Sequence, residues 1–411
     1  MVIVLHLNRA LSYVIALKTF TLHPRAVAPK CPGFFNHKLH HDMQTTPLTE
    51  THRALGAKLV SFAGFEMPLT YSGLKEEHLA VREKAGIFDV SHMGEFIIRG
   101  TGARDLVQYV TSNDVDKLTE GQAQYSCLPR PEGGIVDDLL VYRLPPNPAM
   151  GMTGEHPAYM LVVNAGNIKK DWDWISSHNS FGAEMIDISA QTALLAVQGP
   201  LAAKVLQSLT DTKLDDISYY HFVRGSLAGQ ENVIISATGY TGAGGFELYL
   251  DQAAAEPVWN AILEAGKSAG LIPCGLGSRD TLRLEKGFCL YGNDINDETT
   301  PLEAGLGWIT KLKAGNFVGR DYLVSQKESG LERRLVGFKV DGRRSPRQEY
   351  GILDADGNAI GTVTSGTHSP SLNYPIGLGY VAMGHHTPGT KIQIDLGRKT
   401  TEAEVVKIPF L

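Results

Sequence analysis

The sequence predicts an α+β protein in which a body of mixed helices and strands is followed by a smaller antiparallel β domain. From Thr46 onward, helix-like and strand-like segments alternate in irregular order, without a repeat period. After residue 332 the helix signals largely vanish, and short strands are separated by glycine and proline turns. At 411 residues the chain also exceeds the usual size of one hydrophobic core. We therefore expect a body over residues 46–325 and a barrel or sandwich over residues 332–411.

The first element predicted in the body is an amphipathic helix over residues 76–86. Leu79, Val81 and Ala85 stand among charged residues, and Gly86 provides a C-terminal stop. Strand patterns follow, and after Gly199-Pro200 comes another helix. The strands are expected over residues 88–99, 134–143, 159–164 and 193–197, the helix over residues 201–209, and a proline-rich loop over residues 144–157.

The C-terminal domain is expected to begin after a polar run at residues 325–332. The pattern beyond it is one of short apolar stretches between turn residues, which is typical of a small antiparallel barrel. The predicted strands cover residues 335–340, 359–364, 377–381, 391–394 and 402–406.

The composition excludes several kinds of site and partner. Hydrophobic residues make up 43% and charged residues 20% of the chain, and the net charge of -6 provides no attraction to nucleic acid. The four cysteines lie far apart without a CxxC pair, so neither a zinc site nor a disulfide framework is predicted. We expect no metal, and a reducing compartment fits best.

The first 42 residues differ from the rest and are left out of the fold prediction. They contain five basic residues against one acid, Asp42, which would suit a mitochondrial transit peptide, although only one serine, Ser12, is present. The other interpretation is that Met43 is the true start and that residues 1–42 are a non-native extension. An apolar run at residues 2–17 is interrupted by polar residues and is too short to predict a membrane span.

Two segments resemble familiar catalytic or binding motifs but lack features that these motifs require. Gly266-Lys267-Ser268 resembles the end of a phosphate-binding loop, but Ala261 stands where that motif requires glycine, so no nucleotide is expected. Asp89, Ser91 and His92 include the residue types of a hydrolase triad. Neighbours in a strand point to opposite faces, however, so Ser91 and His92 could not act together. We expect Asp89 or Ser91 to cap a turn beside a buried His92.

Two adjacent acids, Asp137 and Asp138, stand in a predicted strand where acids are disfavoured. Because alternate side chains face opposite sides, we expect that the two carboxylates do not cooperate. One is expected to face a cleft, since buried carboxylates are rare unless paired or functional. The alternative for both is a structural role as acceptors for turn amides.

A glycine-rich turn at residues 238–245 leads into a strand that contains Glu247. Glycines let the backbone approach a ligand closely, and the neighbouring acid could accept a fork of N–H donors from a planar ring. The structural alternative is a long hairpin turn. No GxGxxG is present, so a dinucleotide is not implied.

A helix is expected over residues 278–287, with Arg279 and Arg283 on one face because they are four residues apart. The usual outcome for such a pair is a solvated basic stripe. An anionic ligand would turn the same face into a binding site.

Taken together, these segments match one known family in order, over nearly everything from Thr46 to Phe410. The matching segments are Thr46-Pro47-Leu48, residues 62–68, 88–93 and 133–139, Asn164-Ala165-Gly166, Gln198-Gly199-Pro200, residues 239–242, Arg279-Asp280, and residues 290–295 and 361–366. In this ordered set the sequence closely resembles the aminomethyltransferase, or T-protein, family of the glycine cleavage system.

The resemblance implies three domains arranged like a cloverleaf around a central channel that holds folate. It implies a transferase that moves a one-carbon unit from a lipoylated carrier protein to tetrahydrofolate, without a metal, and we expect a monomer. It assigns Asp138 to the reactive amine of the folate and Glu247 to the pterin edge. Further binding residues implied are Arg279, Tyr125, Asn164 and Tyr240.

Two related classes are weighed against this interpretation. A folate-dependent accessory protein of iron-sulfur assembly has the run Lys-Gly-Cys-Tyr-x-Gly-Gln, whereas residues 286–292 here lack the matching cysteine and glutamine. The folate domain of a flavin-linked dehydrogenase would follow a large dinucleotide-binding domain, which 42 residues cannot contain. The expected location is the bacterial cytoplasm, or the mitochondrial matrix if residues 1–42 are a transit peptide.

Overall fold

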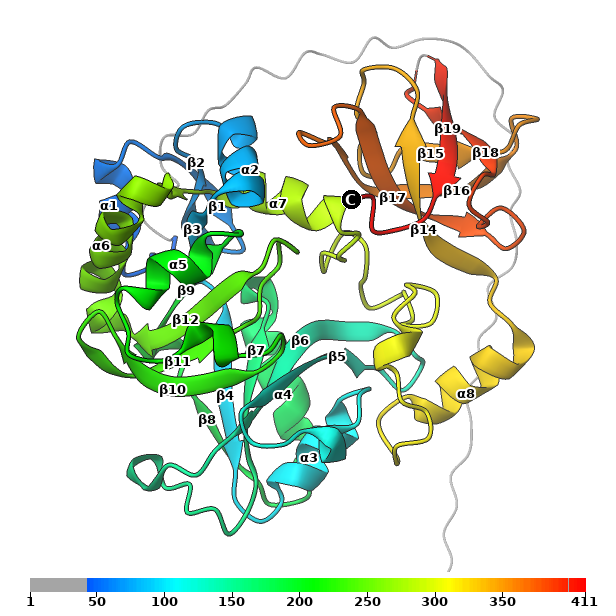
Figure 1. Cartoon of the computed structure of the whole chain (residues 1–411). Helices are drawn as coiled ribbons and strands as arrows, with labels where there is room; N and C mark the ends of the chain where they lie inside the picture. The colour runs from blue at the N-terminus through cyan, green and yellow to red at the C-terminus, as the bar shows by residue number, and fades with distance from the viewer. Residues whose placement is uncertain (1–42, 398) are drawn as a thin grey trace, which may run out of the picture. The chain divides into compact units, whose positions relative to one another are not determined.

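The computed structural model describes residues 43–397 and 399–411. Both interpretations of residues 1–42, and the apolar run within them, therefore lie outside the described residues. No helix in the described part of the chain is long and apolar enough to cross a membrane. Figure 1 shows two sheets with helices around them, and a barrel formed by the C-terminal part of the chain.

The first sheet of the body has six strands, which are antiparallel to their neighbours except for the parallel pair β3 and β13. In spatial order they are β10 (Phe222–Leu227), β11 (Gln230–Ser236), β12 (Gly245–Asp251), β9 (Thr192–Gln198), β3 (Gly86–Asp89) and β13 (Ile272–Pro273). The chain leaves this sheet after β3 and returns at β9.

The second sheet is built from the residues between β3 and β9 and is antiparallel throughout. Its strands in spatial order are β5 (Gln122–Pro129), β6 (Ile135–Leu144), β7 (Ala158–Val163), β4 (Gly94–Arg99) and β8 (Glu184–Asp187). The loop before β7 contains the proline-rich segment, as expected. The two sheets are thus interleaved along the chain.

The single strand predicted over residues 88–99 is wrong, because it is two strands in different sheets. Asp89 ends β3, and its Oδ1 accepts a hydrogen bond from the Ser91 backbone N–H at 2.9 Å, while Met93 N–H donates to Val90 O at 3.1 Å. These bonds close a turn, and β4 begins at Gly94. The expected turn beside a buried His92 is confirmed.

The helices expected over residues 76–86, 201–209 and 278–287 are present, and the body contains further helices besides them. The helices of the body are α1 (Thr49–Ala54), α2 (Leu74–Glu83), α3 (Ala103–Val110), α4 (Ile168–Ser177), α5 (Ala202–Gln207), α6 (Ala255–Gly266), α7 (Leu276–Glu285) and α8 (Arg320–Ser329), beside a hairpin of β1 (Lys58–Phe62) and β2 (Phe65–Thr70). Gly86 does not end α2 but begins β3, where a Cβ would lie 2.6 Å from both Cys274 Sγ and Val81. The polar run expected as a boundary is the end of α8, anchored by the buried Leu323.

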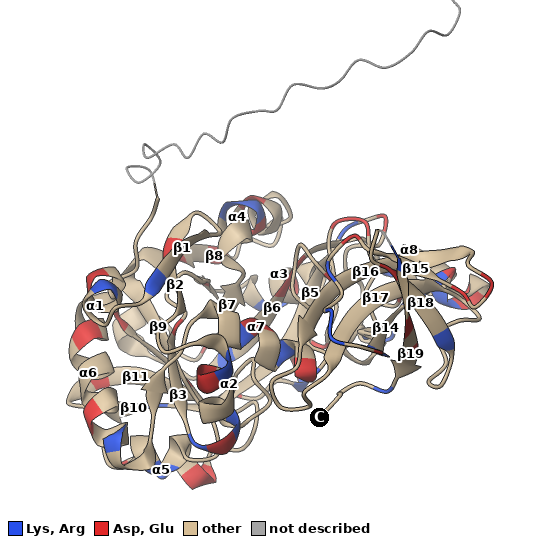
Figure 2. Ribbon diagram, turned by 90° about the horizontal axis from the view of Figure 1, so that it is seen from above, with Lys and Arg blue, Asp and Glu red and all other residues tan. Residues whose placement is uncertain are grey.

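The body has a layered core. Side chains of both sheets, such as Phe88 and Ile97, meet in one shared cluster between the sheets. Trp259 of α6 packs on the outer face of the six-stranded sheet, and Leu106 of α3 and Ile175 of α4 pack on the outer face of the five-stranded sheet. Figure 2 shows charged residues on the outer helices α5 and α6; these are Lys204 on α5 and Glu256 and Glu264 on α6, all exposed, as expected for surfaces that face solvent.

The C-terminal domain is a closed six-stranded barrel, which confirms the expected β domain. Its strands, in order around the barrel, are β14 (Arg333–Val340), β17 (Pro375–Ala382), β16 (Ala359–His368), β15 (Gly351–Leu353), β18 (Lys391–Asp395) and β19 (Thr400–Val406). Phe338, Val381 and Ile394 lie in its core. The prediction missed β15, because three residues are too few to produce a recognisable alternation.

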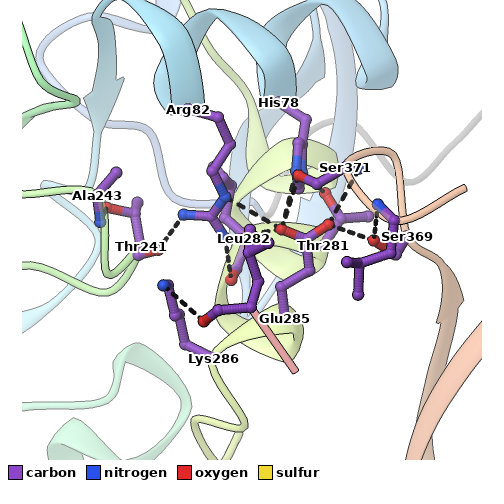
Figure 3. A network of polar contacts seen from close by, with 12 residues as sticks. His78, Arg82, Thr241, Ala243, Thr281, Leu282, Glu285, Lys286, Ser369 and Ser371 are labelled. Atoms are coloured by element: carbon purple, nitrogen blue, oxygen red, sulfur yellow. Dashed lines mark hydrogen bonds and ion pairs between the residues drawn. The ribbon is translucent and has the colours of Figure 1, made fainter. Parts of the chain in front are cut away.

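A buried polar network joins α2, α7 and the barrel segment at residues 369–371 (Figure 3). At its centre the carboxylate of Glu285 accepts hydrogen bonds from Arg82, Ser369 and Ser371, and His78 Nε2 lies 3.2 Å from Glu285 Oε2. Burial alone would raise the pKa of Glu285, but these donors lower it to about 2. The ionised carboxylate therefore holds α7 against both α2 and the barrel.

We predict that Glu285→Gln lowers the free energy of unfolding at pH 7 by roughly 3 kcal/mol, because buried donors lose their charged acceptor. Since the folded pKa is depressed below the usual 4.5, this stability is present above pH 4.5 and is lost as the pH falls toward 2. Urea titrations over this pH range test it. The ion pair of the half-buried Arg99 with the exposed Glu184 supplies the control, for which Glu184→Gln should cost less than about 1 kcal/mol. An equal cost for both variants would contradict the assignment.

Candidate functional site

A cavity of about 1420 Å³ opens between the two sheets, α7, the segment after α7, and the barrel. The C-terminal residues Ile408 and Pro409 also line it. All six residues singled out from the sequence line this cavity, namely Tyr125, Asp138, Asn164, Tyr240, Glu247 and Arg279. The structure therefore brings together residues from five separate segments of the chain.

Asp138 is held at the cavity wall by two donors. Tyr125 Oη, on the neighbouring β5, donates to Asp138 Oδ2 at 2.7 Å, and Asn164 Nδ2 donates to Asp138 Oδ1 at 3.0 Å. Burial, followed by the charge of Asp137, raises the pKa of Asp138 to about 7. The carboxyl group of Asp138 thus titrates near neutral pH while its orientation is fixed.

The expectation that Asp137 and Asp138 do not cooperate is wrong. Asp137 is buried, and it accepts hydrogen bonds from the Asn164 backbone N–H at 3.0 Å, from Asn164 Nδ2 at 2.9 Å and from Asn167 Nδ2 at 2.7 Å. The same Asn164 amide also donates to Asp138. Strand alternation sets the directions of the two Cβ atoms, but Asn164 lies just beyond the end of β7 and contacts both carboxylates. The two acids are therefore electrostatically linked.

Glu247 lies on β12 with its carboxylate facing the cavity. Thr238 Oγ1 donates to Glu247 Oε2 at 2.5 Å, and the Thr238 hydroxyl is in turn 3.1 Å from Tyr142 Oη. Burial raises the pKa of Glu247. The preceding turn approaches α7 closely at Gly242, which has φ +60° and whose Cβ would lie 2.5 Å from the Lys286 side chain. The turn thus links two strands, as the structural alternative required, and also forms part of the cavity wall.

Arg279 provides a positive charge inside the cavity. Its guanidinium carbon lies 4.8 Å from the centre of the Tyr240 ring, and its buried Nη1 has no hydrogen-bond partner in the described part of the chain. Burial lowers the pKa of Arg279, and the Glu247 charge opposes that shift. Glu247 is thus the acid whose charge acts most strongly on Arg279, although no direct ion pair joins the two among the described residues.

The solvated basic stripe that was the usual outcome for Arg279 and Arg283 is not observed. Arg283 is buried, and its Nη1 lies 2.5 Å from Asp294 Oδ2, while its Nη2 donates to Ser365 of the barrel at 2.9 Å. The two arginines on one helix face thus have different environments, since Arg283 is neutralised and Arg279 is not.

Tyr240 forms a wall of the cavity beside Arg279. Its hydroxyl donates to the carbonyl oxygen of Cys289, and its ring stacks on Phe288 with 5.9 Å between ring centres. Both contacts lie on the segment that follows α7. They fix the aromatic face that carries the Arg279 guanidinium.

Several cavity residues were not anticipated as functional. His92 lines the cavity, its Nδ1 has no partner among the described residues, and burial followed by the Arg279 charge lowers its pKa to about 4. Trp308 and Tyr219 also line the cavity although their residues are 62% and 64% exposed, which places them at its mouth. What distinguishes these two aromatic residues is their exposure, and exposure is known only from the structure, so the sequence could not indicate them.

Metal binding finds no support in the geometry of residues 43–397 and 399–411, where no cluster of three or more histidines, cysteines or acids could hold an ion. What the cavity offers instead is a pair of acids, the buried guanidinium of Arg279 and aromatic walls. Such a set suits a flat organic ligand with N–H donors.

The chain matches two family models in order. The GCVT N-terminal domain matches residues 48–314, and the glycine cleavage T-protein C-terminal barrel domain matches residues 333–411. The chain is thus a protein of the class that combines a GCVT N-terminal domain with a T-protein C-terminal barrel.

Curated relatives and a solved structure agree with this class. Aminomethyltransferases from Flavobacterium psychrophilum and Bacteroides fragilis are 55% and 54% identical, each over 90% of this chain and 99% of the relative. The crystal structure of aminomethyltransferase T of the glycine cleavage system from Bartonella henselae superposes with a TM-score of 0.82 at 35% identity, covering 90% of this chain and 98% of that one. The chain belongs to the aminomethyltransferase, or T-protein, family of the glycine cleavage system, which confirms the resemblance.

Two cysteines near Asp138, Cys127 and Cys289, are buried, and burial raises the pKa of each thiol well above its usual value. Because the thiolate is the reactive form, we predict that neither is alkylated by iodoacetamide at pH 8 in the folded protein, whereas both react in guanidinium chloride. Peptide mass mapping identifies each site. Rapid modification of Cys289 in the folded state would contradict this prediction and would show that Cys289 is a reactive nucleophile.

Proposed function

We propose that this chain transfers the one-carbon unit of an aminomethyl-dihydrolipoyl carrier protein to tetrahydrofolate, producing 5,10-methylenetetrahydrofolate and ammonia. The observation that carries the proposal is the placement of Asp138, Glu247 and Arg279 in one cavity, with Asp138 oriented by Tyr125 and Asn164. Family membership supports the same activity.

In the proposed complex, Glu247 accepts hydrogen bonds from the N–H groups along the pterin edge, because a carboxylate matches such a planar fork of donors. Thr238 leaves the second oxygen of Glu247 available to the ligand. Arg279 and Tyr240 then contact the folate beside the pterin. At the mouth, the exposed Arg334 and Lys407 supply positive charge for the carboxylates of the glutamyl tail.

Asp138 is proposed to act on the reacting amine. In the reaction the bond between the carrier's one-carbon unit and ammonia breaks, and the folate amine forms a bond to that carbon. The carrier sulfur then leaves as a thiol and the second folate amine closes the ring. A fixed carboxylate orients the amine and stabilises the positive charge that develops on it. This requires no covalent protein nucleophile, and the reaction is not a redox step.

We predict that Asp138→Asn lowers kcat roughly 10²- to 10⁴-fold, because the amine loses a charged acceptor. In the wild type, activity should fall as the pH decreases through about 7, since protonation of Asp138 removes the carboxylate that the reaction needs. The rate of methylenetetrahydrofolate formation measures both effects. Full activity in Asp138→Asn together with loss in Asp137→Asn would overturn the choice between the two acids.

Replacing Glu247 should separate binding from chemistry. We predict that Glu247→Gln raises KM for tetrahydrofolate roughly 10- to 100-fold, with a smaller change in kcat, because one charge-assisted hydrogen-bond set is worth about 1.5–3 kcal/mol. Glu231→Gln, at an exposed position of β11, is the matched control and should change neither parameter. A loss of kcat with unchanged KM would assign Glu247 to the chemical step instead.

A further inference from the structure

Asp171 is a buried acid that the proposed reaction does not use. It lies on α4, whose inner face also carries the buried Ile175, and it is fully shielded from solvent. Neither carboxyl oxygen of Asp171 has a hydrogen-bond partner in the described part of the chain when the group is treated as an acceptor. A carboxylate without a single donor would be very costly at such a position.

The charged group that acts most strongly on Asp171 is the carboxylate of Asp137, which is also buried. Burial raises the pKa of Asp137, but Asp137 accepts three hydrogen bonds from Asn164 and Asn167, all from N–H donors, which favour its charged form. We therefore assign the charge of the pair to Asp137. Two neighbouring buried carboxyl groups cannot both ionise. Burial, and then the charge of Asp137, raise the pKa of Asp171 to about 11, so Asp171 is a neutral acid at pH 7 and has a hydrogen to donate.

The pair is connected to the cavity through one amide. Asn164 Nδ2 donates to Asp137 Oδ1 at 2.9 Å and to Asp138 Oδ1 at 3.0 Å. The position of this amide and the charge on Asp137 therefore both act on Asp138. A change in the protonation of Asp171 would therefore change both the position of the Asn164 amide and the charge on Asp137.

We propose that Asp171 is a positioning residue that donates its carboxyl hydrogen to Asp137. This hydrogen bond weakens the effect of the Asp137 charge on Asp138, and it thereby sets the pH at which Asp138 ionises. The part of this proposal that concerns activity rests on the proposed role of Asp138. The proton arrangement itself does not depend on any ligand.

Other titratable groups face the two acids and must be considered. Around Asp138 these are Tyr125 and Cys127 of β5, and Tyr240, Cys289 and Tyr291 from the segments near α7. The pKa of each of these five groups is raised by burial, so all are neutral near pH 7.

The cation that faces Asp171 is Lys170, whose Nζ lies 2.6 Å from Tyr291 Oη and 3.2 Å from Asp297. Lys170 is thus already engaged by an acid, and it only partly opposes the effect of Asp137 on Asp171. Of the groups considered, the proton shared by Asp137 and Asp171 is therefore the one expected to change the pH at which Asp138 ionises.

Three variants test the proposal through the titration of Asp138. The titration is monitored by ¹³C NMR of aspartate-labelled protein without substrate, and the Asp138 signal is assigned from its absence in Asp138→Asn. Asp171→Asn keeps a neutral donor and should leave the midpoint unchanged. Asp171→Leu removes the donor, so the full charge of Asp137 should move the midpoint upward by about half a pH unit or more. Asp137→Asn removes that charge and should move the midpoint downward by about one unit.

A shift in Asp171→Asn as large as that in Asp171→Leu would overturn the proposal, because it would mean that Asp171 acts as an ionised group. Identical midpoints in all three variants would reduce Asp171 to a packing residue. If Asp171→Leu does not fold, the infrared difference between wild type and Asp171→Asn decides. A protonated-carboxyl band present in the wild type at pH 7 and absent in the variant supports the proposal, and no such difference overturns it.

The pH profile of kcat provides the link to function. Its acidic limb should move in parallel with the Asp138 midpoint in each variant. Shifted NMR midpoints in a protein without any aminomethyl transfer would refute the proposed function and leave the proton arrangement standing, so the two failures are distinguishable.

Discussion

The buried charges of α7 are the constraint on which the cavity depends. Arg283 pairs with Asp294 and donates to Ser365 of the barrel, and Glu285 accepts from Arg82 of α2 and from the barrel segment at residues 369–371. The helix is thus tied to the body and to the barrel by groups that cannot be exposed without losing their partners. Arg279, one turn earlier on the same helix, faces the cavity, and its buried Nη1 has no hydrogen-bond partner in the part of the chain that the structure describes.

The cavity keeps its ionisable groups in different states by giving them different partners. Asp137 receives three amide donors, which oppose the rise of its pKa on burial. Asp171 receives none within the described residues and has a pKa raised to about 11, and Asp138 receives two donors and titrates near pH 7. Arg279 has no ion pair among residues 43–397 and 399–411, and His92 is neutral because it is buried beside Arg279. A cavity of this kind provides one adjustable carboxylate in an otherwise fixed electrostatic setting, as electrostatic catalysis requires.

The sequence predicted the strands that have clear apolar alternation, and it failed where packing overrides pattern. Gly86 looks like a helix stop but is needed for close packing against Cys274, and β15 is too short to be recognised. For the site, residue patterns alone indicated a strand acid and a glycine-rich turn, and only the ordered resemblance selected Asp138 and Glu247 together. Asp171 escaped notice because one acid on an amphipathic helix has no distinctive pattern, although it occupies the buried face.

The central claim is that the cavity around Asp138 joins the carrier's one-carbon unit to tetrahydrofolate. The most direct measurement uses a carrier loaded with a ¹³C-labelled aminomethyl group, mixed with tetrahydrofolate and the purified chain, and follows the label by NMR while ammonia is assayed. The account predicts that the label appears in methylenetetrahydrofolate with one ammonia released per transfer, and that Asp138→Asn slows this conversion severely. Label that remains on a competent carrier in the presence of the wild-type chain, with no ammonia formed, would contradict it.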